Sequence, residues 1–470
     1  MQVTNKDALG KVCVLGFGRT GFGVVEYLAG LSAERVESIV LFGGASAWAS
    51  EKTAELEARG IRVVCGTDEL DDEFDLAIVS PGIPPTSAFF ASAVAHAREV
   101  IGEPEFAWRE SPQRWVGITG TNGKTTTTML VTALLEAGGL DAKAVGNIGV
   151  VATGEIAQRP EGQWFVAELS SFQLATTQRL HPRVGILLNV TPDHLEWHGS
   201  LEEYAKAKER LFENFDEADL AIVSVDDGWS RDVAERLEER GLRVCRVSVH
   251  GDPGSANAAY VEGGWLRIRA GVCVQALIRR ENLSLEGEHN VQNALCAAAL
   301  ALDLGVSLDA VSDVLASFKP LEHRIEPCGE HNGVRFVNDS KATNVDSVEK
   351  ALTAFESGTV IVLLGGHDKG TELTTLAQAV SSHCRVAVCY GEAGPRIAAA
   401  LRAVDGTTGL EVVDAVHLAD ALEAAVKRAC PGEVVLLSPA CSSFDEFKSF
   451  QERGAVFKGL VANMFGGEGA

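Results

Sequence analysis

The feature that most constrains this chain is the stretch GITGTNGKTT at residues 117–126. Residues 114–116 predict a short incoming strand, and the apolar residues of 129–135 recur at helical spacing. A strand, a glycine-rich turn and a helix that begins with Gly-Lys-Thr form a phosphate cradle, because backbone N–H groups and the helix dipole attract the anion. The sequence therefore predicts an α/β fold with a nucleotide site.

Two side chains of this loop suit the chemistry of a nucleotide. The Lys124 ammonium neutralises terminal phosphate charge, and the Thr125 hydroxyl can hold Mg²⁺. The strict Walker pattern has a glycine at the place of Ile118, so the loop is a variant. A structural turn with a chance lysine is the alternative, and the Gly-Lys-Thr context favours ATP. We predict that ATP contacts Gly120, Thr121, Asn122, Gly123, Lys124, Thr125 and Thr126.

Length, charge and cysteine spacing limit the class of protein. A chain of 470 residues exceeds one core, and roughly 150 residues per domain predicts three domains. The net charge of −24 disfavours nucleic acid or an anionic membrane as the main partner. The ten cysteines form no CxxC pair, and several lie in apolar runs, which predicts buried reduced thiols. With no leader pattern and no apolar run of about 18 residues, we expect a cytoplasmic protein.

A second glycine-rich turn, GFGRTG at residues 16–21, follows the predicted strand 11–16 and opens a helix. This pattern is typical of dinucleotide sites, which also need an acidic residue at the end of the next strand. Here that strand, residues 38–41, ends in Phe-Gly-Gly at 42–44, which disfavours a nicotinamide cofactor. The glycines still allow close approach of a pyrophosphate, such as that of a nucleotide sugar. Tight helix–strand packing alone is the remaining alternative.

Polar residues end several further predicted strands. Glu168 follows the strand 164–167, and residues 189–194, which include His194, follow a second strand. A carboxylate at a strand end beside a phosphate loop is well placed for Mg²⁺. Either residue alone would be taken for a cap or a surface group, but the combination predicts one metal–phosphate site. Asn147 lies in a predicted turn.

The second half of the chain gives weaker local signals. From spacing alone, the lysines of the predicted helix 204–212 would be solvated and have no role. Asn290 and Asn293 fall on one face near the start of a buried helix, and capping is a plausible alternative for Asn290. Strands and helices then alternate again after a candidate linker at residues 319–320. Three of these strands end in polar or glycine-rich loops, which predicts a third open α/β sheet with ligand groups on one edge.

Assembled in chain order, these residues resemble the Mur ligases, the ATP-dependent amino-acid-adding enzymes of peptidoglycan synthesis. The resemblance runs essentially end to end and is highly specific to a superfamily that also includes folylpolyglutamate synthases. The shared motifs are residues 120–126, Glu168, 193–194, 288–293, 323–324 and 339–344.

Three features are similar to the members that add D-glutamate to UDP-N-acetylmuramoyl-L-alanine. They are the first glycine turn with residues 80–83, the loop 365–370, and residues 437–450 with 453–454. The Asp-Asn-Pro-Arg-like element of the diaminopimelate- or lysine-adding members is missing. The resemblance implies a monomer with a Rossmann-like UDP-sugar domain, a central P-loop ATPase-type domain and a C-terminal Rossmann-like amino-acid domain. Their expected ranges are residues 1–105, 106–319 and 320–470.

The resemblance also implies binding residues. The UDP-sugar would contact Gly18, Arg19, Thr20, Ser80, Pro81, Gly82, Asn147 and Ser170. Beyond the phosphate loop, ATP would contact Asn147, Asn293, Arg324 and Asp339. Glutamate would contact Thr343, Lys369, Ser443 and Phe450. Relatives often place an acidic residue where this chain has Phe-Gly-Gly at 42–44, so the uracil or ribose contact stays open.

Two Mg²⁺ ions are implied at Thr125, Glu168, His194 and Lys208, with Lys208 carbamylated by CO₂. The implied catalytic residues are Lys124, His194 and Lys208, where His194 is a metal ligand or, as a second option, the general base for the amine. The implied reaction forms an acyl phosphate, which the amine of glutamate attacks. A folate polyglutamylase, a nicotinamide oxidoreductase and a nucleotide-regulated module without enzymatic activity remain alternatives, and the handedness of the glutamate stays open.

Overall fold

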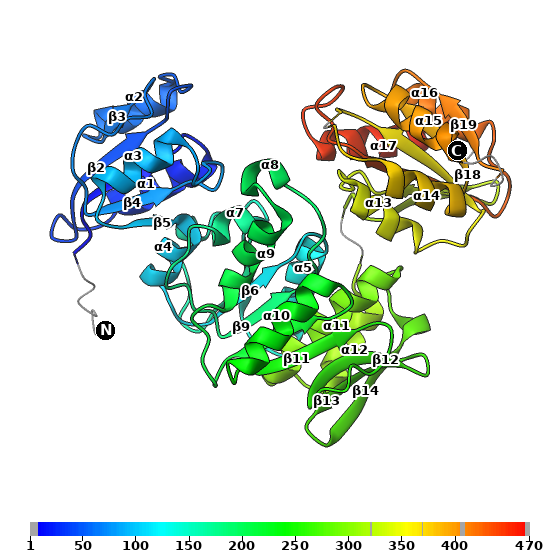
Figure 1. The fold of residues 1–470 in the computed structure, drawn as a ribbon, viewed down its shortest axis with the longest axis horizontal. Coiled ribbons are helices and arrows are strands. Elements are labelled where there is room, and N and C mark those ends of the chain that lie inside the picture. Colours follow the sequence, from blue (N-terminus) through cyan, green and yellow to red (C-terminus); the bar gives the residue numbers. More distant parts are fainter. Residues whose placement is uncertain (1–7, 320–321, 369, 405–408, 466–470) are drawn as a thin grey trace. The chain divides into compact units, whose positions relative to one another are not determined.

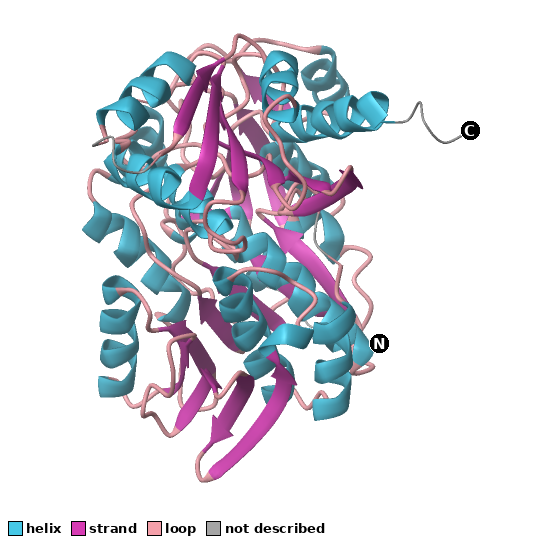
Figure 2. Ribbon diagram, turned by 90° about the vertical axis from the view of Figure 1, so that its right-hand side faces the viewer, coloured by secondary structure: helices cyan, strands magenta, loops and turns pink. Residues whose placement is uncertain are grey.

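The structure of the protein is a computed structural model that describes residues 8–319, 322–368, 370–404 and 409–465. Its strands form three separate sheets in which most neighbours are parallel, so the predicted α/β class is confirmed. Helices, drawn in cyan, flank the magenta strands in Figure 2. By its internal contacts the chain divides into two units, Met1–Arg279 with Gln292–Val314, and Arg280–Val291 with Leu315–Ala470. Each unit is described by itself.

The first sheet, drawn in blue in Figure 1, has five parallel strands in the order β3-β2-β1-β4-β5. Val12 and Val14 belong to the apolar cluster on one face, whereas Cys13 and Leu15 belong to the cluster on the other. Burial on both faces explains the unbroken apolar run of β1. The order reverses between β1 and β4, and ligands bind at such a switch point. The strands are β1 (Gly10–Leu15), β2 (Val36–Phe42), β3 (Arg62–Val64), β4 (Leu76–Val79) and β5 (Val100–Gly102), and the helices are α1 (Arg19–Ala29), α2 (Glu51–Ala58), α3 (Ala88–His96) and α4 (Glu103–Glu110).

The second sheet, in the same unit, has nine strands in the order β14-β13-β12-β11-β10-β9-β6-β8-β7. Its strands from β7 to β12 are parallel, and β13 and β14 extend it as an antiparallel hairpin that the sequence analysis did not predict. The strands are β6 (Trp115–Thr119), β7 (Ala142–Gly146), β8 (Trp164–Glu168), β9 (Val184–Leu187), β10 (Leu220–Ser224), β11 (Arg243–Ser248), β12 (Asn257–Glu262), β13 (Trp265–Ala270) and β14 (Cys273–Arg279).

Helices connect these parallel strands. The predicted helix 204–212 is an α-helix, α9, that ends at Glu209 and continues as a 3₁₀ turn, Arg210–Phe212. The division between the two units falls within α11. The α-helices of this segment are α5 (Lys124–Ala137), α6 (Ala152–Ile156), α7 (Ser171–Leu174), α8 (Leu195–His198), α9 (Leu201–Glu209), α10 (Gly228–Glu239), α11 (Glu288–Asp303) and α12 (Leu308–Ser317).

The third sheet lies in the second unit and has the order β15-β16-β20-β17-β18-β19, with only β15 antiparallel. Val362 faces one apolar cluster and Leu363 the other, so both faces of the sheet are covered. The strands are β15 (Glu326–His331), β16 (Val334–Asn338), β17 (Val360–Gly365), β18 (Cys384–Tyr390), β19 (Glu411–Asp414) and β20 (Val434–Ala440), and the helices are α13 (Val345–Leu352), α14 (Thr374–His383), α15 (Gly394–Ala403), α16 (Leu418–Val426) and α17 (Phe450–Phe465).

Several smaller expectations can be compared with this fold. All ten cysteines are free thiols and most are buried, as predicted, although Cys273 and Cys430 are exposed. In the described part of the chain, every helix is too short or too polar to cross a bilayer. Pro320 of the candidate linker lies outside the described residues. The domain boundaries after residues 105 and 319 stay predictions.

Candidate active site

The phosphate loop joins β6 to α5 at the carboxyl edge of the second sheet, where β6 lies between β8 and β9. Gly123 precedes the helix with a φ of 84°, a left-handed conformation that favours glycine. A Cβ at this position would lie 2.4 Å from Oδ1 of Asn293 on α11. The loop therefore needs glycine here for its backbone conformation and for its contact with Asn293.

Asn189, which follows β9, braces the phosphate loop. Its Oδ1 accepts a hydrogen bond from the Asn122 backbone N–H at 2.9 Å, and its Nδ2 donates to the Asn122 carbonyl at 3.2 Å. The backbone N–H of Thr121 donates to the Asn189 carbonyl, and Tyr204 Oη donates to Thr121 Oγ1 at 3.1 Å. The sequence analysis placed Asn189 at a strand end but gave it no role.

Two lysine amines converge on one carbonyl of this loop. Lys124 Nζ donates to the carbonyls of Gly120 and Thr121, each at 2.8 Å. Lys208 Nζ also donates to the Gly120 carbonyl at 2.8 Å. The two amines thus meet at one carbonyl of the phosphate loop.

Lys208 is only 1% exposed, so the prediction from spacing that the lysines of this helix are solvated was wrong for Lys208. It was right for Lys206, which is exposed and pairs with Glu202 and Glu203. Lys208 lies on the face of α9 that packs inward with Tyr204, whose ring is 4.4 Å from its Nζ. Burial, together with the nearby Lys124 ammonium, holds the pKa of the Lys208 amine well below its usual range.

Glu168 ends β8 directly beside the phosphate-loop strand, where it pairs with Ile118. Its side chain is buried, and Oε1 accepts a hydrogen bond from Asn147 Nδ2 at 2.8 Å. Its Oε2 has no hydrogen-bond partner among the described residues. A buried carboxylate oxygen without a partner is costly, and a divalent cation would satisfy it.

His194 is the N-cap of the short helix α8 and has a φ of 53°. Its ring lies 4.8 Å from Phe172 and 6.5 Å from Tyr204, between centroids, and Nε2 lies 3.6 Å from Oδ2 of Asp193. The sequence analysis did not single out His198, whose Nε2 lies 2.9 Å from Ser171 Oγ. Its position one helical turn after His194 was the signal that could have found it.

The predicted nucleotide-sugar residues of the first sheet gather at its switch point, because residues 16–21 follow β1 and residues 80–82 follow β4. Ser80 Oγ is buried without a hydrogen-bond partner among the described residues. Gly18 is the N-cap of α1, and Arg19 Nη1 donates to the Gly149 carbonyl at 2.8 Å. The structure thereby links α1, which also carries Thr20, to the turn of Asn147. Ser170 lies apart from this group as the N-cap of α7.

The predicted residues of the second unit lie in the loops at the carboxyl edge of the third sheet. Asp339 is buried after β16 and accepts hydrogen bonds from Ser438 Oγ at 2.8 Å and the Ile325 N–H at 3.3 Å. Burial raises the pKa of its carboxyl to about 7, against the opposing effect of the Ser438 hydrogen bond and the Arg324 charge. Thr343 lies in the loop before α13, Ser443 is buried after β20, and Phe450 begins α17. Lys369 lies outside the described residues.

Comparison with known proteins shows the family of this chain. Residues 118–301 match the Mur ligase middle domain, and residues 323–441 match the Mur ligase, glutamate ligase domain. The UDP-N-acetylmuramoylalanine–D-glutamate ligase of Geobacillus kaustophilus is 37% identical over 458 residues, which cover 97% of this chain and 98% of that protein. The chain belongs to the Mur ligase family.

Other Mur ligases extend the comparison. The enzyme of the same name from Koribacter versatilis is 36% identical over 97% of this chain and 98% of its own length. Among solved structures, a pseudomurein peptide ligase from Methanothermus fervidus has a TM-score of 0.60 at 16% identity, and it covers 97% of this chain and 100% of its own. The UDP-N-acetylmuramate–alanine ligase of Thermotoga maritima has a TM-score of 0.55 at 19% identity, with 97% and 99% coverage. These two structures share the fold.

The Mur ligase middle domain contains the phosphate loop, Glu168, His194, Lys208 and Asn293, all in the first unit. The phosphate loop, Glu168, His194 and Lys208 belong to segments that follow or flank β6, β8 and β9. The structure therefore brings these segments to one edge of the second sheet. The predicted residues of the first sheet form a separate group, which the bond between Arg19 and Gly149 links to that edge.

Proposed function

We propose that this chain is an ATP-dependent ligase that joins D-glutamate to UDP-N-acetylmuramoyl-L-alanine and forms ADP and phosphate. The observation that carries the proposal is local. The amines of Lys124 and Lys208 share the Gly120 carbonyl, and the neighbouring strand ends in a buried Glu168 oxygen that has no partner in the described part of the chain. Such a set fits the γ-phosphate of a nucleotide with its metal ion. The names of the relatives supply the substrates.

The first step overcomes the poor reactivity of a carboxylate as an acyl donor. The carboxylate of the alanyl residue attacks the γ-phosphorus of ATP, the bond to ADP breaks, and an acyl phosphate forms. Lys124 would leave its two loop carbonyls and move its charge onto the transferring phosphoryl group. The backbone of residues 120–126, fixed by Asn189, would hold the remaining phosphates.

Metal binding belongs to the same proposal. Bound Mg²⁺ would offset the charge on the phosphates during the transfer. Glu168, His194 and Thr125 would supply ligands, and the Glu168 oxygen that has no partner among the described residues fits this role. A neutral amine reacts with CO₂, and the lowered pKa of Lys208 favours its neutral form. We therefore include a carbamate on Lys208 as a ligand for a second ion.

The second step takes place when the amine of glutamate attacks the carbonyl carbon of the acyl phosphate. The tetrahedral intermediate then expels phosphate and leaves an amide. We assign the amino acid to Thr343, Lys369, Ser443 and Phe450, and the nucleoside of ATP to Asn293, Arg324 and Asp339. Asn147 is proposed as a further ATP contact. His194 is proposed mainly as a metal ligand.

The nucleotide sugar is assigned to the switch point of the first sheet. Ser80 Oγ, buried without a partner among the described residues, can donate to a phosphate oxygen. Further contacts are proposed for Gly18, Arg19, Thr20, Pro81, Gly82, Asn147 and Ser170. The proposal includes the domain ranges 1–105, 106–319 and 320–470, a monomeric state and a cytoplasmic location, where ATP is available.

The test is phosphate release from ATP and Mg²⁺ with UDP-N-acetylmuramoyl-L-alanine, adding D-glutamate or L-glutamate in turn. We expect release only when the nucleotide sugar and D-glutamate are both present. Release with L-glutamate alone would keep the mechanism and change the product. Release with neither would refute the proposed substrates.

A further inference from the structure

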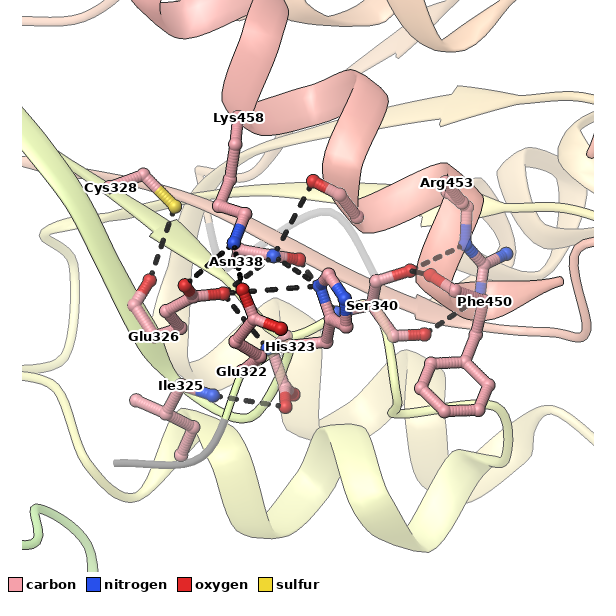
Figure 3. A network of polar contacts seen from close by, with 12 residues as sticks. Glu322, His323, Ile325, Glu326, Cys328, Asn338, Ser340, Phe450, Arg453 and Lys458 are labelled. Atoms are coloured by element: carbon pink, nitrogen blue, oxygen red, sulfur yellow. Dashed lines mark hydrogen bonds and ion pairs between the residues drawn. The ribbon is translucent and has the colours of Figure 1, made fainter. Parts of the chain in front are cut away.

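Arg453, on the first turn of α17, carries a guanidinium that the mechanism above does not use. The residue is 0% exposed. Its Nε donates to Ser340 Oγ at 3.0 Å, and its two Nη atoms donate to three backbone carbonyls. Those carbonyls belong to Ser340 at 2.8 Å, Cys441 at 3.1 Å and Ser442 at 3.2 Å. Figure 3 shows this guanidinium against Ser340.

The four accepting oxygens lie in the two loops that were assigned to glutamate. Ser340 precedes Thr343 in the loop after β16, and Cys441 and Ser442 precede Ser443 in the loop after β20. The two strands are parallel neighbours in the sheet. The His367 N–H also donates to the Ser442 carbonyl at 2.9 Å, which ties in the loop after β17. One guanidinium therefore connects the polar ends of neighbouring strands.

The kind of partner distinguishes Arg453 from a structural arginine of the same sheet. All four oxygens that it contacts among the described residues are uncharged. At the amino edge of the sheet, Arg385 instead pairs with the carboxylate of Glu433, with Nη2 at 2.7 Å from Oε2, and donates to one carbonyl, that of Arg428, at 2.6 Å. An ion pair needs only two side chains to meet, whereas three carbonyl contacts fix the orientation of three peptide planes.

This orientation matters because a trans peptide points its C=O and N–H in opposite directions. With the Cys441 and Ser442 carbonyls turned to the guanidinium, the N–H groups of Ser442 and Ser443 point away from it. The preceding Ala440 has a φ of 61°, a strained conformation that persists only where the surroundings enforce it. The bonds from Arg453 hold the segment directly after this residue.

The first turn of α17 also positions Phe450, another residue that is assigned to glutamate. The Phe450 carbonyl accepts a hydrogen bond from Ser340 Oγ at 2.8 Å, and Lys341 Nζ lies 3.9 Å from the centroid of the Phe450 ring. A Cβ at Gly454 would lie 2.2 Å from His323 Nδ1. His323 can therefore pack here only because residue 454 has no side chain. Figure 3 shows His323, Ser340 and Phe450 along this part of the helix.

We propose that Arg453 is a positioning residue for the amino-acid substrate, because its guanidinium sets the peptide planes of the two loops that carry Thr343 and Ser443. The inference rests on the proposed function. It predicts a specific defect in glutamate binding, since misplaced loops weaken the contacts with that substrate while the phosphate loop in the other unit is unchanged.

The test compares Arg453→Met, Arg453→Lys and the control Arg385→Met, which loses a guanidinium at the opposite edge of the sheet. The KM values for D-glutamate, ATP and the nucleotide sugar are measured with kcat, together with the midpoint of thermal unfolding. We expect Arg453→Met to raise the KM for D-glutamate at least 10-fold and to leave the KM for the nucleotide sugar within 2-fold. The KM for ATP should rise less than that for D-glutamate, because only Asp339 of the proposed ATP contacts adjoins Ser340. Arg453→Lys keeps one or two of the bonds and should fall between wild type and Arg453→Met. Arg385→Met should lower the midpoint without changing any KM.

Three other outcomes would contradict either the proposed function or the positioning role of Arg453. Absence of D-glutamate-dependent phosphate release in the wild-type protein overturns the proposed function itself. Normal wild-type activity with an unchanged KM for D-glutamate in Arg453→Met overturns only the present inference. If neither variant of Arg453 folds, the residue determines the fold and the positioning role is rejected.

Discussion

The two glycine-rich loops of this chain, residues 16–21 and 117–126, use similar backbones for different purposes. Each leaves a parallel strand and enters a helix at the carboxyl edge of its sheet. The first loop contains no lysine, and its Arg19 donates to the Gly149 carbonyl at 2.8 Å. The second holds the amines of Lys124 and Lys208 on one carbonyl. A glycine turn permits close approach of a phosphate, and we propose that the amines of the second loop determine where phosphoryl transfer occurs.

The largest expected effect is at Lys124. Lys124→Ala should lower kcat by about 10³-fold with the fold intact, because the transferring phosphoryl group loses its cation. Phosphate release and circular dichroism measure the two quantities. Lys143→Ala, which removes a half-buried lysine of β7 that pairs with Glu155, is the control and should keep normal activity. Activity of Lys124→Ala within 10-fold of wild type would refute the ATP assignment.

Lys208 should show the next largest effect. Lys208→Ala should lower kcat by about 100-fold, since a metal ligand is lost, and short carboxylic acids should restore part of it. The pKa of this amine is lowered, so it is neutral above that pKa and protonated below it. Only the neutral amine takes up CO₂, so wild-type activity should fall as pH is lowered and rise again with added bicarbonate. Lys206→Ala, two residues away and exposed, is the control. A Lys208→Ala variant that no carboxylic acid rescues would count against the carbamate.

The first loop should respond to a change in its backbone packing. A Cβ at Gly21 would lie 1.9 Å from the Gly16 carbonyl oxygen, whereas one at Gly18 would meet nothing within 4 Å. Gly21→Ala should therefore destabilise the first sheet by about 2 kcal/mol, and Gly18→Ala by less than about 0.5 kcal/mol. Midpoints of denaturant unfolding compare the two variants. Equal midpoints would show that the close approach is not needed.

The smallest expected effect separates binding from chemistry. Arg19→Ala removes the bond to Gly149 and should raise the KM for the nucleotide sugar about 10-fold, with kcat unchanged. Steady-state kinetics with saturating ATP and D-glutamate measure both constants. A fall in kcat as large as that of Lys124→Ala would erase the distinction between the two loops.

Local patterns predicted the strand before each loop. β1 begins and ends one residue before the expected range 11–16, whereas β6 continues three residues beyond the expected range 114–116. The hairpin of β13 and β14 was not predicted, because its strands carry mixed polar and apolar residues in a region without a motif. The prediction from residue spacing that Lys208 is solvated was also wrong. From the sequence alone, a lysine on a polar helix is predicted to be solvated. Only the structure shows the carbonyl that accepts its hydrogen bond.

The sequence by itself determined the α/β class, the two glycine turns and the motif set of the Mur ligases. These depend on short-range rules, such as residue periodicity and the conformations open to glycine. Only the tertiary structure brought Lys208 to Gly120, 88 residues away, and left one oxygen of Glu168 without a partner among the described residues. The order of strands in a sheet decides which strand ends become neighbours, and that order follows from the packing of the whole sheet.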